Sequence, residues 1–198
     1  MRTILSFVIG SALGLLAALW FSGLVDLGPQ RWLKGVDVAG WRTDLAIGSS
    51  SANPYVRAGV ARRGLLALSK SEAIYFTRNV DDAGERLHEG CRYQLSGSAF
   101  PAHWWSITLY DANSGLPDNT DDALSVDATK VGPTEQWSAI IAPLKPDGEE
   151  HWISSRNAGQ FDLTLRIYRP SSGLLSSLEK ALDPPSIAKL TCTGKEAS

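Results

Sequence analysis

The chain begins with an apolar run from Ile4 to Val25 that contains no charged residue. As an α-helix rising about 1.5 Å per residue, this run would be about 33 Å long, enough to cross a hydrocarbon core of about 30 Å. A buried helix of a globular domain is rarely apolar on every face over such a length. We therefore predict that residues 1–26 form an uncleaved transmembrane anchor.

A cleaved signal peptide is the alternative, because Arg2 supplies the positive charge that precedes the apolar core of such peptides. The end of the run, from Leu19 to Gly23, lacks the small residues spaced as A-x-A that mark a cleavage site. A leader as short as residues 1–3 is expected to stay inside. The chain after Asp26 is therefore expected to be extracytoplasmic.

The chain contains two cysteines, Cys91 and Cys192. An even pair in an exported domain is compatible with one disulfide. Cys91 opens one predicted strand and Cys192 ends the last one, so pairing of these strands would bring the two thiols together. Two separate buried thiols are the alternative, and the disulfide is the interpretation that we favour.

Residues 27–50 are interpreted as a juxtamembrane tether and residues 51–195 as one domain, which is long enough to bury its own core. Trp32 and Trp41, both in the tether, are expected either at the membrane interface or in that core. The net charge of -2 and the absence of a basic stripe argue against nucleic acid as a partner.

Near the beginning of the predicted domain, the sequence contains residues typical of a helix N-terminus. Asn53 is placed as its N-cap and Pro54 at its first position, and apolar residues recur at helical spacing to about Ser69.

After Ala73 the apolar residues alternate with polar ones, which indicates strands. The alternation is clearest over residues 104–110 and 161–168. Other strands are expected at Ile74–Phe76, Tyr93–Gly97, Ala139–Ala142 and Ile187–Cys192, with a weaker one over 123–131 and a short helix over 174–182. Short strands separated by Gly, Pro, Asn and Asp turns are typical of antiparallel sandwiches. We predict a mainly β, antiparallel jelly-roll-like sandwich with one short N-terminal helix.

Three stretches occur in a specific order: Arg92-Tyr93-Gln94-Leu95, then Trp104 to Asp111, then Phe161 to Pro170. In this order and separation they resemble the bacterial domain of unknown function 1214 family. The resemblance implies a β-rich, jelly-roll-like fold in the bacterial envelope, so a single-pass inner-membrane protein with a periplasmic domain is expected. Members are often joined to, or found beside, a domain of unknown function 1254, which makes such a protein the implied partner.

No cofactor or metal is predicted, because the chain has no glycine-rich phosphate loop, paired CxxC or HExxH motif. The adjacent Glu149, Glu150 and His151 would point to opposite faces of a strand, which argues against a shared metal ion. His103, Ser106 and Asp111 are the residue types of nucleophilic catalysis but lack a nucleophile elbow. No catalytic residue is therefore assigned.

The polar face of the two clearest strands is the candidate ligand- or partner-binding surface. Its predicted members are Trp104, Thr108, Tyr110, Thr164, Arg166 and Tyr168. Aromatic rings, hydroxyls and a guanidinium suit stacking on a sugar or holding an anion. They also suit docking of a partner protein, while ordinary strand propensity and an Arg166 ion pair are the structural alternative.

We interpret the chain as a membrane-anchored binding or assembly module for a partner protein or an envelope glycan. A hydrolase acting on a carbohydrate or another small envelope substrate is the second hypothesis. It would need two carboxylates about 5 to 9 Å apart across a cleft. The candidates by residue type are Asp111, Asp118, Asp121, Asp122 and Asp162.

Overall fold

A computed structural model describes residues 2–21, 35–43, 57 and 68–192 of the chain. The chain divides into two units, residues 1–35 with 44–69 and residues 36–43 with 70–198. Helix α1 (Arg2–Phe21) belongs to the first unit. Among the described residues, no helix combines the length and the apolar character needed to span a membrane. The helix predicted from Asn53 lies mostly outside the described residues.

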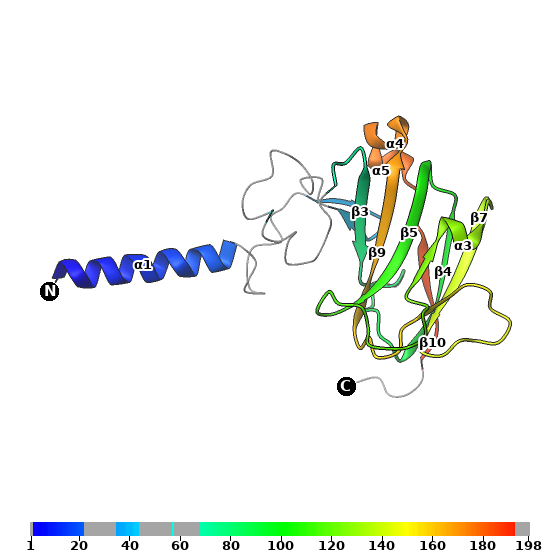
Figure 1. Cartoon of the computed structure of the whole chain (residues 1–198), viewed down its shortest axis with the longest axis horizontal. Helices are drawn as coiled ribbons and strands as arrows, with labels where there is room; N and C mark the ends of the chain where they lie inside the picture. The colour runs from blue at the N-terminus through cyan, green and yellow to red at the C-terminus, as the bar shows by residue number, and fades with distance from the viewer. Residues whose placement is uncertain (1, 22–34, 44–56, 58–67, 193–198) are drawn as a thin grey trace. The chain divides into compact units, whose positions relative to one another are not determined.

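The second unit is built from two β-sheets (Figure 1). In the six-stranded sheet all neighbours are antiparallel, in the order β1 (Val36–Val38), β2 (Trp41–Thr43), β3 (Ala73–Arg78), β9 (Phe161–Pro170), β5 (Ala102–Asp111) and β6 (Ser125–Asp127). The four-stranded sheet has the order β10 (Ser186–Cys192), β4 (Cys91–Ser98), β7 (Gln136–Ala142) and β8 (Trp152–Ser154), with β7 and β8 parallel. The prediction of a mainly β fold is confirmed.

The two sheets share one hydrophobic core. Alternation along β5 and β9 turns one side of each strand inward, so Ile107 and Leu165 are fully buried. Leu95 of β4 and Ile141 of β7 approach the same core from the other sheet. Burying these aliphatic side chains supplies roughly 1.5–3 kcal/mol each.

Short helices cap the ends of strands. The predicted helix over 174–182 is two helices, α4 (Ser172–Ser176) and α5 (Leu178–Ala181), at one end of the six-stranded sheet (Figure 1). The weak strand predicted over 123–131 is only three residues long as β6, and α3 (Ala128–Val131) follows it. The change occurs at Asp127, whose carboxylate accepts hydrogen bonds from the backbone N–H groups of Thr129 and Lys130 and so starts the helix.

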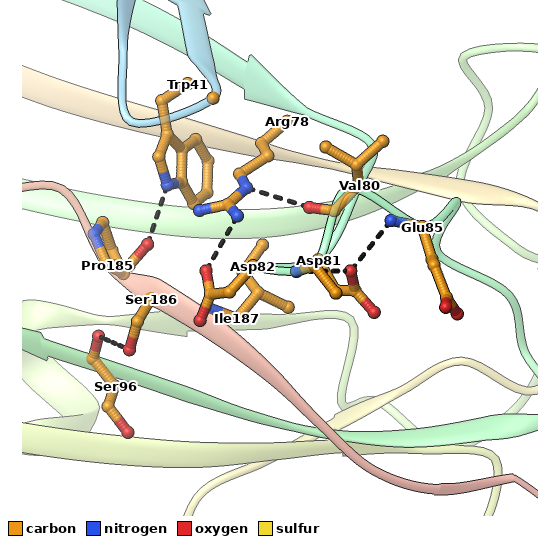
Figure 2. Close-up of polar contacts among 12 residues, drawn as sticks. Trp41, Arg78, Val80, Asp81, Asp82, Glu85, Ser96, Pro185, Ser186 and Ile187 are labelled. Atoms are coloured by element: carbon orange, nitrogen blue, oxygen red, sulfur yellow. Dashed lines mark hydrogen bonds and ion pairs between the residues drawn. The ribbon is translucent and has the colours of Figure 1, made fainter.

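Strands β1 and β2 form a hairpin inside the 27–50 segment that the sequence predicts as a tether. Ala39 and Gly40 make the two-residue turn with φ of 51° and 84°, as a type I′ turn requires. Trp41 is fully buried, so it occupies the core, one of its two predicted positions. Its indole N–H donates to the Pro185 carbonyl oxygen at 2.8 Å (Figure 2).

An arginine beside Trp41 connects the end of β3 to β10 (Figure 2). Arg78 is only 5% exposed, and it donates to the Val80 carbonyl oxygen at 2.9 Å and to Asp82 Oδ1 at 2.8 Å. The same Asp82 oxygen accepts from the backbone N–H of Ile187 in β10 at 3.0 Å. This buried charge is therefore paired and hydrogen-bonded, which offsets its desolvation.

The predicted disulfide is present. Cys91 and Cys192 are bonded to each other and are direct partners in the antiparallel pairing of β4 with β10. The bond closes a loop with a sequence separation of 101 residues.

Candidate functional site

The structure brings together the six residues predicted as a binding surface. Strands β5 and β9 are neighbours, and their register places Trp104 opposite Tyr168 and Thr108 opposite Thr164. Arg166 and Tyr110 belong to the same row of alternate residues, on the side of the sheet away from the shared core. We call this surface the β5–β9 outer face, consisting of Trp104, Thr108, Tyr110, Thr164, Arg166 and Tyr168. Thr164 is buried, so the other five are the residues that a ligand or partner could contact.

Arg166 is at the centre of the β5–β9 outer face and is half-buried. Its guanidinium donates from Nη1 to Thr108 Oγ1 at 3.2 Å and from Nη2 to Tyr110 Oη at 2.5 Å. The guanidinium carbon lies 5.3 Å from the centroid of the Tyr110 ring, within cation–π range. Both hydroxyl partners are neutral, so these bonds fix the position of the group without cancelling its charge.

Two aromatic rings stand one step further along the same face. The ring centroids of Trp104 and Tyr168 are 5.4 Å apart and their planes are tilted by 54°. The Trp104 indole N–H donates to Thr129 Oγ1 of α3 at 3.0 Å. Both rings are half-buried, so they present fixed apolar area beside a fixed cation.

The carboxylates named for a hydrolase do not assemble as a pair on this face. Asp111 Oδ1 accepts from the backbone N–H groups of Asn113 and Gly115 at 2.9 and 2.8 Å, which closes a turn. Asp121 forms an ion pair with Arg156. Asp162 lies on the same side of the sheet as the outer face, opposite Tyr110. Near Arg166 these carboxylates therefore do not form the pair, about 5 to 9 Å apart, that a glycosidase needs.

The residue types of a catalytic triad are separated as well. His103 and Ser106 are an odd number of positions apart on one strand, β5, so their side chains project from opposite faces. In the part of the chain that the structure describes, no group of three or more His, Cys, Asp or Glu residues could hold a metal ion. Glu149 forms an ion pair with Arg92 at 3.2 Å, while Glu150 and His151 line a cavity.

The loops after β5 and β8 are joined by a polar network that the sequence analysis missed. Asp121 accepts hydrogen bonds from Ser154 Oγ at 2.6 Å and from Arg156 Nη2 and Nε at 2.5 and 3.0 Å. The Ser154 hydrogen bond, followed by those of Arg156, lowers the pKa of the Asp121 carboxyl. Asn119 also donates to the Arg156 carbonyl oxygen at 2.8 Å, so the two loops hold each other in place.

Two cavities lie beside α3. The first, which we call the polar cavity, has a volume of about 430 Å³ and a wall that includes Asp122, Lys130, Lys145, Glu150, His151 and Trp152. The second, of about 310 Å³, is lined by residues that include Phe100, Trp105 and Trp137. Neither cavity was predictable from the sequence, because their walls come from segments that no local pattern connects.

A protein-family model described as "Protein of unknown function (DUF1214)" matches residues 72–172 of the chain. No curated protein matches the chain. Among solved structures, the VPA0106 protein from Vibrio parahaemolyticus is similar with a TM-score of 0.56 and 16% identity, over 71% of this chain and 36% of that one. An uncharacterised protein from Burkholderia cenocepacia has a TM-score of 0.42 and 12% identity, over 60% of this chain and 29% of that one. The chain thus spans about a third of the length of these proteins.

Proposed function

We propose that this chain, which belongs to the DUF1214 family of proteins of unknown function, is a binding module that docks a partner protein on its β5–β9 outer face. The observation that carries the proposal is the position of Arg166, which is half-buried and hydrogen-bonded to Thr108 and Tyr110. The Trp104 and Tyr168 rings lie one step further along the same face. Because its position is fixed before a partner arrives, little side-chain entropy is lost on binding. Its remaining N–H groups can donate to a carboxylate or carbonyl oxygen of the partner.

The composition of the face favours a protein over a small substrate. Trp, Tyr and Arg are the residue types enriched in the energetic centres of protein interfaces. They stand on two adjacent ten-residue strands, and both cavities described above are lined by other side chains. The hydrolase hypothesis has less support on this face, since Asp111 and Asp121 are engaged in other contacts and Asp122 lies in the polar cavity instead.

The partner that we propose is a separate protein carrying a domain of unknown function 1254. The family resemblance supplies this candidate, because members of the family are often joined to, or found beside, such a domain.

We further propose that the jelly-roll-like domain is held at a bacterial inner membrane, on the periplasmic side, by the apolar run from Ile4 to Val25. The absence of charge over the run supports this placement. Isolated membranes should keep the protein after washing with alkaline carbonate and release it only with detergent. Release by carbonate or high salt would exclude the anchor, and a soluble periplasmic protein as a control should be recovered in the wash.

The docking proposal is tested by replacing Arg166. In a pull-down of the full chain from detergent-solubilised envelopes, the Arg166→Ala variant should recover the partner with affinity reduced about 30-fold, the effect of losing an interface contact of about 2 kcal/mol. The partner would be identified by mass spectrometry and its affinity measured by titration against the purified chain. Equal recovery by the variant would contradict the docking face.

A matched control separates docking from a general effect of charge. Arg86 is exposed and lies between β3 and β4, outside the outer face. Arg86→Ala removes the same charge and should leave partner recovery unchanged. Thermal unfolding of each variant shows whether the fold is intact, because loss of the fold would also abolish recovery.

A further inference from the structure

We propose that the polar cavity is a binding site for an acidic sugar unit, a ring that carries one carboxylate and several hydroxyls. The cavity is distinct from the β5–β9 outer face, so this proposal does not depend on the docking of a partner. Its volume of about 430 Å³ lies within the roughly 300–1,000 Å³ of small-molecule sites.

The walls of the polar cavity are held in place by hydrogen bonds between different segments. The backbone N–H of Ser154 donates to the Ala123 carbonyl oxygen at 2.6 Å, which fixes the β5–β6 loop against β8. The backbone N–H of Ile140 donates to the His151 carbonyl oxygen at 2.9 Å, which fixes His151 of the cavity wall against β7. A site with fixed walls does not have to be ordered by its ligand.

Two lysines give the cavity its means of binding a carboxylate. Lys130 of α3 donates to the Ser125 carbonyl oxygen at 2.8 Å, and two further N–H groups of its ammonium are left for a ligand. Lys145, in the connection between β7 and β8, is exposed and lines the same cavity. The negative charge of Asp121 is balanced by its ion pair with Arg156. Asp122 and Glu150 also line the cavity, but among the described residues neither forms an ion pair with Lys130 or Lys145, so both ammonium groups stay available to a ligand.

The remaining wall suits the rest of a sugar. Trp152 is half-buried, and its indole N–H donates to the Ala142 carbonyl oxygen at 2.9 Å, which fixes the ring and leaves its face to stack on the C–H groups of a sugar. The carboxylates of Asp122 and Glu150 are acceptors only, which matches the hydroxyl donors of a sugar. An uncharged sugar would leave the two lysines unused, and a simple anion would leave Trp152 unused.

The test uses the full chain in detergent, with D-glucuronate as the probe and D-glucose as its uncharged comparison. Isothermal titration calorimetry and saturation-transfer NMR should detect glucuronate binding at least tenfold tighter than glucose binding, the effect of one charge-assisted contact of about 1.5 kcal/mol or more. Absence of glucuronate binding, or equal binding of the two sugars, would overturn the proposal.

Substitutions then locate the binding site. Lys145→Gln at this exposed position should weaken glucuronate binding about tenfold and leave thermal unfolding unchanged, and Trp152→Leu should weaken the binding of both sugars. Lys180→Gln in α5 removes the same charge at an exposed position outside the cavity and should have no effect. Glucuronate binding that is unaltered in Lys145→Gln would overturn the assignment even if Trp152→Leu failed to fold.

Discussion

Replacing both cysteines by serine is expected to lower the free energy of unfolding by up to about 4 to 5 kcal/mol, the largest single effect that we predict. The Cys91–Cys192 bond joins positions 101 residues apart, so its removal frees a long loop in the unfolded chain. In the chain-entropy model the loss increases with the logarithm of loop length. Urea denaturation of the full chain should therefore show a lower midpoint for C91S/C192S, with dithiothreitol lowering the wild-type midpoint toward the same value.

The position of the disulfide predicts which part of the fold loses stability first when the bond is removed. β10 is the edge strand of the four-stranded sheet and pairs only with β4 within that sheet, and Cys192 is its last residue. Amide hydrogen exchange should therefore increase more in residues 188–192 than in the central strand β9. Dithiothreitol must leave C91S/C192S unchanged, since the variant has no disulfide to reduce. Equal denaturation midpoints for oxidised wild type and variant would contradict the prediction.

The parts of the fold that were predictable from the sequence are those with a local repeat. Alternation along residues 104–110 and 161–168 defines both the strands and the side of each strand that faces the core. The six residues of the β5–β9 outer face were predicted for the same reason, although their functional role stays a prediction. The disulfide followed because Cys91 and Cys192 stand at the ends of two predicted strands.

The missed elements depend on contacts between distant segments. Strands β1, β2 and β8 are three residues each, too short for alternation to separate them from loops. Their strand geometry is stabilised by neighbours, as in the parallel pairing of β8 with β7. The Asp121–Arg156 ion pair joins residues 35 positions apart, and neither residue carries a local signal of the other. The polar cavity is formed by such contacts and was missed with them.

Replacing Trp41 by alanine is expected to lower the free energy of unfolding by about 3–5 kcal/mol, the cost of deleting a large aromatic side chain from a packed core. Trp41 is 0% exposed and belongs to the shared hydrophobic core. The hairpin that carries it is joined to the six-stranded sheet through β2, whose register with β3 is the pair Arg42 and Thr77. The indole is therefore expected to contribute much of the attachment of the hairpin, and urea denaturation of Trp41→Ala measures that contribution.

A phenylalanine variant separates packing from hydrogen bonding at the same position. Trp41→Phe keeps most of the buried ring but removes the N–H that donates to the Pro185 carbonyl oxygen (Figure 2). An unpaired buried carbonyl costs about 1–3 kcal/mol, so Trp41→Phe should be less stable than wild type and more stable than Trp41→Ala. If the urea midpoint of Trp41→Ala equals that of the wild type, the hairpin does not contribute to the cooperative core. Residues 36–43 would then act as part of the tether that the sequence predicts. A loss in Trp41→Phe as large as in Trp41→Ala would instead mean that the contact with Pro185, rather than packing, attaches the hairpin.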